Sequence, residues 1–166
     1  GQLLVAAEVE YSRVAVAHPE EEAPVAIGNQ QSPIVQAIAH AEAGTTGEIR
    51  VHLSRKWIEQ NPMQRARTLF EQFGMHQTTH RNAVLIYVNL RRRKFAIFGD
   101  SGVNEVVGPH YWEQVATNLR EHLRGTHPER AIAFSVQEVG EVLKKYFPAD
   151  PDSDNTNELP NLVSED

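Results

Sequence analysis

The sequence predicts a single α/β domain built around a small mixed β-sheet. Helix-like segments with apolar residues three or four positions apart alternate with short strand-like segments. Two of the strand-like runs are apolar on both faces, as expected of strands covered on each side. The length of 166 residues suits one core with tails. We expect an N-terminal extension of uncertain order at 1–31, a folded domain at 32–148 and an acidic flexible tail at 149–166.

The first half of the folded domain alternates helix, strand and helix. Ser32 and Pro33 are typical of a helix start, and Gly44 is typical of a helix end. Apolar and polar residues alternate over 46–53, which predicts a strand with one polar face near an edge of the sheet. A second helix is expected at about 62–73, because Asn-Pro precedes it and a glycine follows it.

The second half contains a hairpin followed by two longer helices. The unbroken apolar run at 83–89 predicts a central strand, and 94–99 predicts a third strand after a short polar turn. Helical spacing of apolar residues predicts the two helices at 109–124 and 128–147, and the segment between the third strand and the first of these reads as a loop.

The order of these elements brings several polar residues to one edge of the sheet. A helical crossover makes the first two strands parallel, and the hairpin makes the third strand antiparallel to both. The starts of the first two strands and the end of the third therefore meet at the same edge. This places Glu48 near Asp100, with Asn104 and Glu105 following Asp100 in the chain. Carboxylate and amide oxygens are the ligands that Ca²⁺ or Mg²⁺ prefers, so these four residues are the candidate metal ligands.

A structural interpretation of the same residues remains open. Gly-Asp at a strand end is a common turn and helix-capping device, and Glu48 could form a surface ion pair with Arg50 or Arg81. The same two arginines are candidate anion-binding residues. His52 is expected to be exposed, because it falls on the polar face of the first strand.

Composition excludes several classes of function. The chain has no cysteine, which excludes a disulfide framework, a thiolate nucleophile and cysteine-ligated zinc. The sequence contains no phosphate-binding loop, serine nucleophile elbow or dinucleotide fingerprint. Net charge is −6, and the basic residues are scattered, so we expect no nucleic-acid partner. No signal peptide or membrane span is recognised, and we expect a cytoplasmic monomer whose protein partner is unknown.

Three segments together resemble the TPM domain family, which includes a thylakoid-lumen acid phosphatase and photosystem II repair proteins. They are "GTTGEIRVHLS", "GMHQTTHRNAVLIYVNLRRRKFAIFGDSGVNEVVGPHYWE" and "GEVLKKYFP", and the likeness covers 32–148. The resemblance implies a three-layer α/β/α sandwich with a small mixed sheet. It also implies divalent-cation binding by loops at one sheet edge, around Glu48 and Asp100. Family members often carry acids at the hairpin tip, where this chain has Arg91 to Arg93.

Two functional interpretations follow. The first is a divalent-cation-binding, non-catalytic interaction domain that acts in assembly, repair or quality control of membrane-associated proteins, as the resemblance implies. The alternative is a metal-assisted acid phosphatase, in which a cation held by Asp100 and Glu48 polarises a phosphomonoester and activates water, with Arg50 or Arg81 binding the anion.

Overall fold

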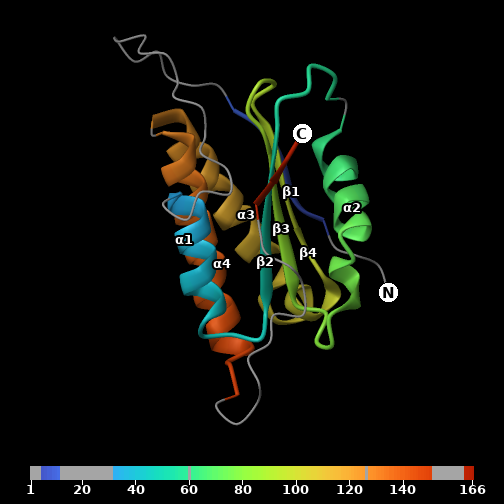
Figure 1. Ribbon diagram of the computed structural model, residues 1–166, viewed down its shortest axis with the longest axis vertical. Helices are drawn as coiled ribbons and strands as arrows, with labels where there is room; N and C mark the ends of the chain where they lie inside the picture. The colour runs from blue at the N-terminus through green and yellow to red at the C-terminus, as the bar shows by residue number, and fades with distance from the viewer. Residues whose placement is uncertain (1–4, 12–31, 60, 126, 151–162) are drawn as a thin grey trace.

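The computed structural model describes residues 5–11, 32–59, 61–125, 127–150 and 163–166 (Figure 1). The side chains of residues 5–10, and residues 1–4 and 12–31 of the expected N-terminal extension, lie outside this description. The elements are β1 (Val5–Glu10), α1 (Pro33–Glu42), β2 (Glu48–Ser54), α2 (Pro62–Gln72), a 3₁₀ turn η1 (Met75–Gln77), β3 (Ala83–Asn89), β4 (Lys94–Gly99), α3 (Ser101–Gly125), α4 (Pro128–Tyr146) and β5 (Val163–Glu165).

The described residues form a three-layer α/β/α sandwich, which confirms the predicted fold class. The sheet has the strand order β1-β4-β3-β2-β5. Helices α1, α3 and α4 cover one face, and α2 covers the other (Figure 1). Each face has its own apolar core, and alternate residues of β3 enter one core or the other, so that all seven of its residues are buried.

Strand directions agree with the sequence analysis. β2 pairs with β3 in parallel and β3 pairs with β4 in an antiparallel hairpin. The crossover between the parallel strands is α2, as expected from the short helix between them. β3 lies at the centre of the sheet, which confirms its predicted position.

The start of α3 differs from the sequence prediction. Residues 101–107, expected as a loop, are helical, and the backbone breaks at Gly108, where φ is 72° and ψ is 170°. Pro109 then begins the longer part of the helix, as predicted. Asp100 therefore precedes a helix directly, instead of a loop that could wrap around an ion.

Both ends of the chain add strands to the sheet. β1 pairs with β4, and β5 pairs with β2 in parallel from Val51 to Leu53. The sequence predicted a flexible tail at 149–166, but 163–165 form an edge strand; 151–162 lie outside the described residues. β5 also covers His52, which is buried and not exposed as predicted. Within the described part of the chain, no helix is both long and apolar enough to cross a membrane.

Candidate functional site

The starts of β2 and β3 and the end of β4 meet at one edge of the sheet, which we call the rim. Glu48 is paired with Ala83 across β2 and β3. The amide of Asp100 donates a hydrogen bond of 3.0 Å to the carbonyl oxygen of Ala83. The predicted common edge is therefore confirmed. Glu48 and Asp100 nevertheless flank β3 on opposite sides, so about 10 Å separates their backbones at the usual strand spacing.

Asp100 is fully buried and its carboxylate has two protein partners. Arg81 donates from Nε at 2.8 Å and from Nη2 at 3.0 Å, one bond to each carboxylate oxygen. The amide of Ser101 donates to the same carboxylate at 2.7 Å, at the start of α3. The hydrogen bond and the charge of Asp100 raise the pKa of Arg81 further above its usual range. Asp100, at the end of β4, therefore links the first residue of α3 to the guanidinium of Arg81.

The other two predicted ligands are placed differently. Asn104 is buried, and its amide nitrogen donates to the Gly99 carbonyl at 2.7 Å while its amide oxygen accepts from Trp112 Nε1 at 2.7 Å. Glu105 is exposed on α3. Among the residues that the structure describes, no three His, Cys, Asp or Glu side chains gather closely enough to hold a metal ion. The rim does not bring Glu48, Asp100, Asn104 and Glu105 together as one ligand set.

Glu48 has a carboxyl neighbour that the sequence analysis missed. Glu42, the last residue of α1, is buried together with Glu48, and the two side chains share a hydrogen bond. Burial, the charge of Glu48 and that hydrogen bond raise the pKa of Glu42 to about 9, against a smaller opposing effect of the Ile49 backbone. At neutral pH Glu42 therefore keeps its proton. The sequence feature that could have indicated this pair is the position of Glu42 and Glu48 on either side of a Gly-Thr-Thr-Gly turn.

Buried oxygen atoms without partners occur in the pair itself and at Asn82, whose backbone is hydrogen-bonded to that of Glu48. The Oε2 atom of Glu42 and the Oδ1 atom of Asn82 are both buried without a hydrogen-bond partner. The side-chain amide nitrogen of Asn82 donates to the Thr46 hydroxyl at 3.1 Å, and the backbone carbonyl oxygen of Asn82 accepts from the Glu48 backbone amide. Buried polar atoms without partners are uncommon in folded proteins, so each calls for an explanation. Both atoms are oxygens, which are the ligand type of hard cations.

The turn that joins α1 to β2 is fixed to the end of α4. The Thr45 hydroxyl donates to the carbonyl oxygens of Leu143 and Phe147, and it accepts from the Gly47 amide at 3.0 Å. These bonds hold the segment between Glu42 and Glu48 in one conformation, so the two carboxyls are kept close by the surrounding fold.

The candidate anion-binding arginines engage different partners. The guanidinium of Arg50 lies 3.6 Å from the centre of the Phe73 ring, in the layer between β2 and α2. Burial lowers the pKa of Arg50. Arg81 is half exposed at the rim and paired with Asp100. The two side chains therefore do not serve a common anion in this arrangement.

We predict that replacing Glu42 by Gln flattens the pH dependence of stability. Glu42 has a pKa of about 9 when folded and 4.5 when free, so between these values the folded chain binds more protons. The free energy of unfolding then falls as pH rises through this window, by up to about 1.4 kcal/mol per pH unit.

Urea unfolding of the wild type and of Glu42→Gln at about pH 5, 7 and 9 measures this contribution, because other titrating groups cancel in the comparison. As pH rises, the unfolding free energy of Glu42→Gln should increase relative to that of the wild type. A constant difference would show that Glu42 has no raised pKa.

The fold and the rim define a small α/β/α domain whose buried carboxyls gather where two parallel strands begin. The chain belongs to the TPM domain family, whose sequence profile matches residues 27–142. Among solved structures it is similar to the BA42 protein from the psychrophilic bacterium Bizionia argentinensis, determined by NMR. Identity is 34%, the match covers 79% of this chain and 88% of BA42, and the TM-score is 0.71. A search of curated proteins gave no match.

Proposed function

We propose that this protein is a non-catalytic interaction domain that binds a divalent cation, Ca²⁺ or Mg²⁺, at the rim through Glu42 and Glu48. The observation that supports this proposal is the buried carboxyl pair. Two carboxyls at hydrogen-bond distance cannot both ionise unless a positive charge lies between them. At neutral pH a proton fills that role, and a divalent cation can replace it.

The residues around the pair fit a hard cation. Glu42 Oε2 and Asn82 Oδ1 are buried oxygens without hydrogen-bond partners, and the Thr46 hydroxyl lies beside Asn82. Calcium takes six to eight oxygen ligands, usually with water among them, and magnesium takes six. The proposal keeps Glu48 from the predicted ligand set and adds Glu42. Asp100, Asn104 and Glu105 are assigned no direct bond to the ion.

The acid phosphatase alternative requires Asp100 to hold the cation. In the structure Arg81 binds both oxygens of that carboxylate, and Ser101 donates to it as well. This pairing neutralises the acid that would have to bind the metal, and it uses Arg81, one of the two arginines that would bind phosphate. It therefore favours the binding domain over the enzyme.

A wider role in assembly, repair or quality control of membrane-associated proteins is part of this proposal and rests on the family membership. A cation bound by Glu42 and Glu48 would join the end of α1 directly to the start of β2, beside the turn that Thr45 holds against the end of α4. Cation binding would in this way rigidify one end of the domain for a partner.

Backbone amide shifts during Ca²⁺ and Mg²⁺ titration test the cation site. We expect saturable shifts at residues 42–49 and 82 in the wild type, and a loss of affinity of at least about tenfold in Glu48→Gln. Glu105→Gln is the matched control, because that acid is exposed on α3 and should leave the affinity unchanged.

Hydrolysis of p-nitrophenyl phosphate, measured in the same samples, distinguishes the two functions. Saturable shifts without turnover support the binding domain. Cation-dependent turnover that Asp100→Asn abolishes, with the fold intact, would identify an enzyme. If no rim amide responds to either cation, the proposed site is wrong.

A further inference from the structure

The opposite end of β2 carries a second polar cluster, which the cation proposal does not use. The last residues of the chain lie along the edge of β2 as β5 (Figure 1), in parallel register with Ser164 beside His52. The pairing continues past β5, because the Asp166 amide donates to the Leu53 carbonyl at 3.0 Å and the Asp166 carbonyl accepts from the Arg55 amide at 3.0 Å.

The side chains of this terminal segment are held by groups from β2, from the loop after it and from α2. His52 is buried, with Nδ1 2.7 Å from the Ser164 hydroxyl and Nε2 3.2 Å from the Asp166 carboxylate. Arg65 donates to the same carboxylate, and Lys56 Nζ lies 3.5 Å from it. We call the surrounding residues the tail site; they are His52, Ser54, Arg55, Lys56 and Arg65.

The tail site is complementary to one pattern of side chains. It accepts a hydroxyl at one position and a carboxylate two residues later, both on the face that points toward α2. Burial alone would raise the pKa of Asp166, but hydrogen bonds from Ser54 and His52 and the charges of His52 and Arg65 outweigh it and hold the pKa at about 2. The tail site therefore binds the Asp166 carboxylate strongly. The backbone pairing of an edge strand does not by itself require an acid at that position.

The segment that occupies the tail site is weakly anchored otherwise. β5 has three residues, and Val163 is only partly buried at the margin of the core. The ion pair of Glu165 with Arg55 spans 3.6 Å between side chains that are both well exposed, so it adds little stability. A segment held by a few backbone bonds and partly solvated ion pairs can be displaced by a similar segment that makes additional contacts.

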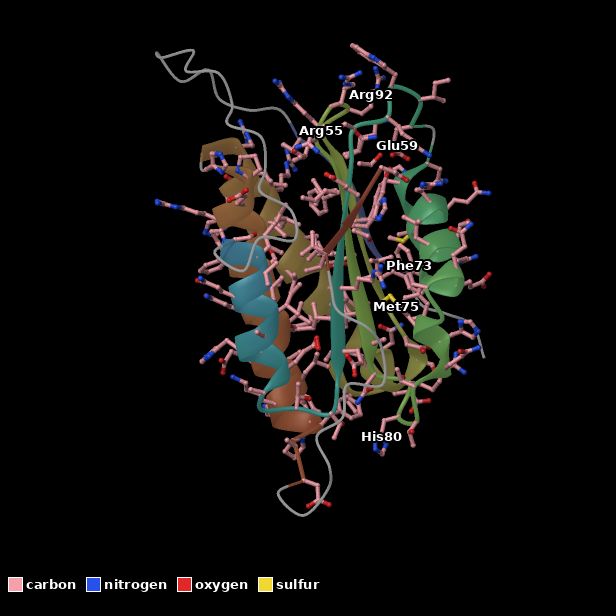
Figure 2. All side chains as sticks on the ribbon, in the orientation of Figure 1. Arg55, Glu59, Phe73, Met75, His80 and Arg92 are labelled. Carbon is pink, nitrogen blue, oxygen red and sulfur yellow. The ribbon has the colours of Figure 1, made fainter. Side chains whose placement is uncertain are left out.

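Additional contacts are available directly beyond the tail site. Because β5 runs parallel to β2, a longer segment would continue past Asp166 toward the loop that follows β2. There Trp57 and Ile58 expose 68% and 80% of their surface, and the Arg91 guanidinium lies 4.3 Å from the Trp57 ring centre. Figure 2 shows Arg55 and Arg92 at this same end of the molecule. Residues 163–166 do not cover this apolar and basic surface, since the side chains of Trp57 and Ile58 stay exposed.

We infer that the edge of β2 is a docking site for an extended acidic segment of a partner protein, which adds a parallel strand in place of residues 163–166. The segment would carry a hydroxyl residue, two acids and then apolar residues that reach Trp57 and Ile58. The chain's own tail is the internal competitor. This inference is independent of the cation site, which lies at the other end of β2.

A fluorescein-labelled peptide with the sequence NLVSED followed by two leucines is the probe. In the full chain, Asp166→Lys should release the tail, because it places a cation beside Lys56 and Arg65. We expect the peptide to bind Asp166→Lys at least about tenfold more tightly than the wild type. Adding Arg65→Ala to that variant should remove the gain, and Trp57→Ala should remove the effect of the two leucines.

Three outcomes would overturn the inference. The first is equal affinity of the peptide for the wild type and for Asp166→Lys. The second is binding that Arg65→Ala leaves unchanged. The third is a concentration-dependent dimer of the wild type that Asp166→Lys abolishes, since the docking site would then belong to a second copy of the chain. A blue shift of Trp57 fluorescence on peptide binding supports the inference.

Discussion

Gly102→Ala is expected to lower the free energy of unfolding by about 3 kcal/mol or more. A Cβ atom on Gly102 would lie 2.1 Å from the carbonyl oxygen of His80 and 2.7 Å from that of Arg81. The neighbouring atoms are backbone and cannot move aside as a flexible side chain would, so the cost lies at or above the usual range for overpacking. The first turn of α3 would have to move away from the turn that precedes β3.

Gly125→Ala is the matched control for this substitution. Gly125 is the last residue of α3, and a Cβ atom there would meet nothing within 4 Å. Its effect on the unfolding free energy should stay within about 0.5 kcal/mol. Urea unfolding of the two variants decides the matter. Equal stabilities would show that the start of α3 does not approach the 80–81 backbone as closely as described.

Asp100→Ala is expected to cost about 2–4 kcal/mol of unfolding free energy. The substitution removes a fully buried carboxylate that accepts from Arg81 and from the Ser101 amide. Breaking a buried ion pair on one side usually costs about 3–5 kcal/mol, but Arg81 is half exposed and water can solvate the freed guanidinium. We therefore expect the loss of unfolding free energy to lie near the lower end of that range.

Arg81→Ala tests the same ion pair from its exposed side. It leaves the Asp100 carboxylate buried with fewer donors, so it should also destabilise the chain. Asp100→Asn should be milder than Asp100→Ala, because its amide oxygen can still accept from Ser101. Thermal unfolding at neutral pH gives the order. If Asp100→Ala were as stable as the wild type, Asp100 would be free for another role, such as the metal binding that the sequence suggested.

Much of the fold follows from local patterns. The alternation over β2 and the apolar run of β3 are short-range signals, and the short α2 between them leaves few ways to connect the strands. These features fixed strand direction, and strand direction fixed the edge at which Glu48 and Asp100 lie. The start of α3 was missed because Gly108 and Pro109 are typical of a helix beginning. The earlier residues become helical where Asp100 and the 80–81 backbone hold them.

The contacts at the rim could not be read from periodicity. Glu42 lies at the end of one element and Glu48 at the start of the next, so their contact depends on how Thr45 fixes the intervening turn to α4. Asp100 was correctly placed at the rim, but its pairing with Arg81 requires the backbone of Arg81 to adopt a φ of 51°. Such a conformation is uncommon for arginine, and no sequence pattern indicates it.

The strand at 163–165 was not predicted, for a different reason. The composition of the tail is rich in proline and polar residues, which is typical of flexible segments, and yet residues 163–166, which the structure describes, pair with the sheet. The strand forms because His52, Lys56 and Arg65 supply partners from distant parts of the chain. The burial of His52 depends on that same segment, so both predictions failed together.

Proton release on cation binding is the most direct test of the proposed rim site. Calorimetric titration of Ca²⁺ and Mg²⁺ at pH 7 in two buffers with different ionisation enthalpies counts the protons released. If the cation replaces the proton held by Glu42 and Glu48, about one proton should leave per cation bound, and Glu42→Gln should release none. Binding without proton release, or release that Glu42→Gln leaves unchanged, would place the cation elsewhere and contradict the proposed function.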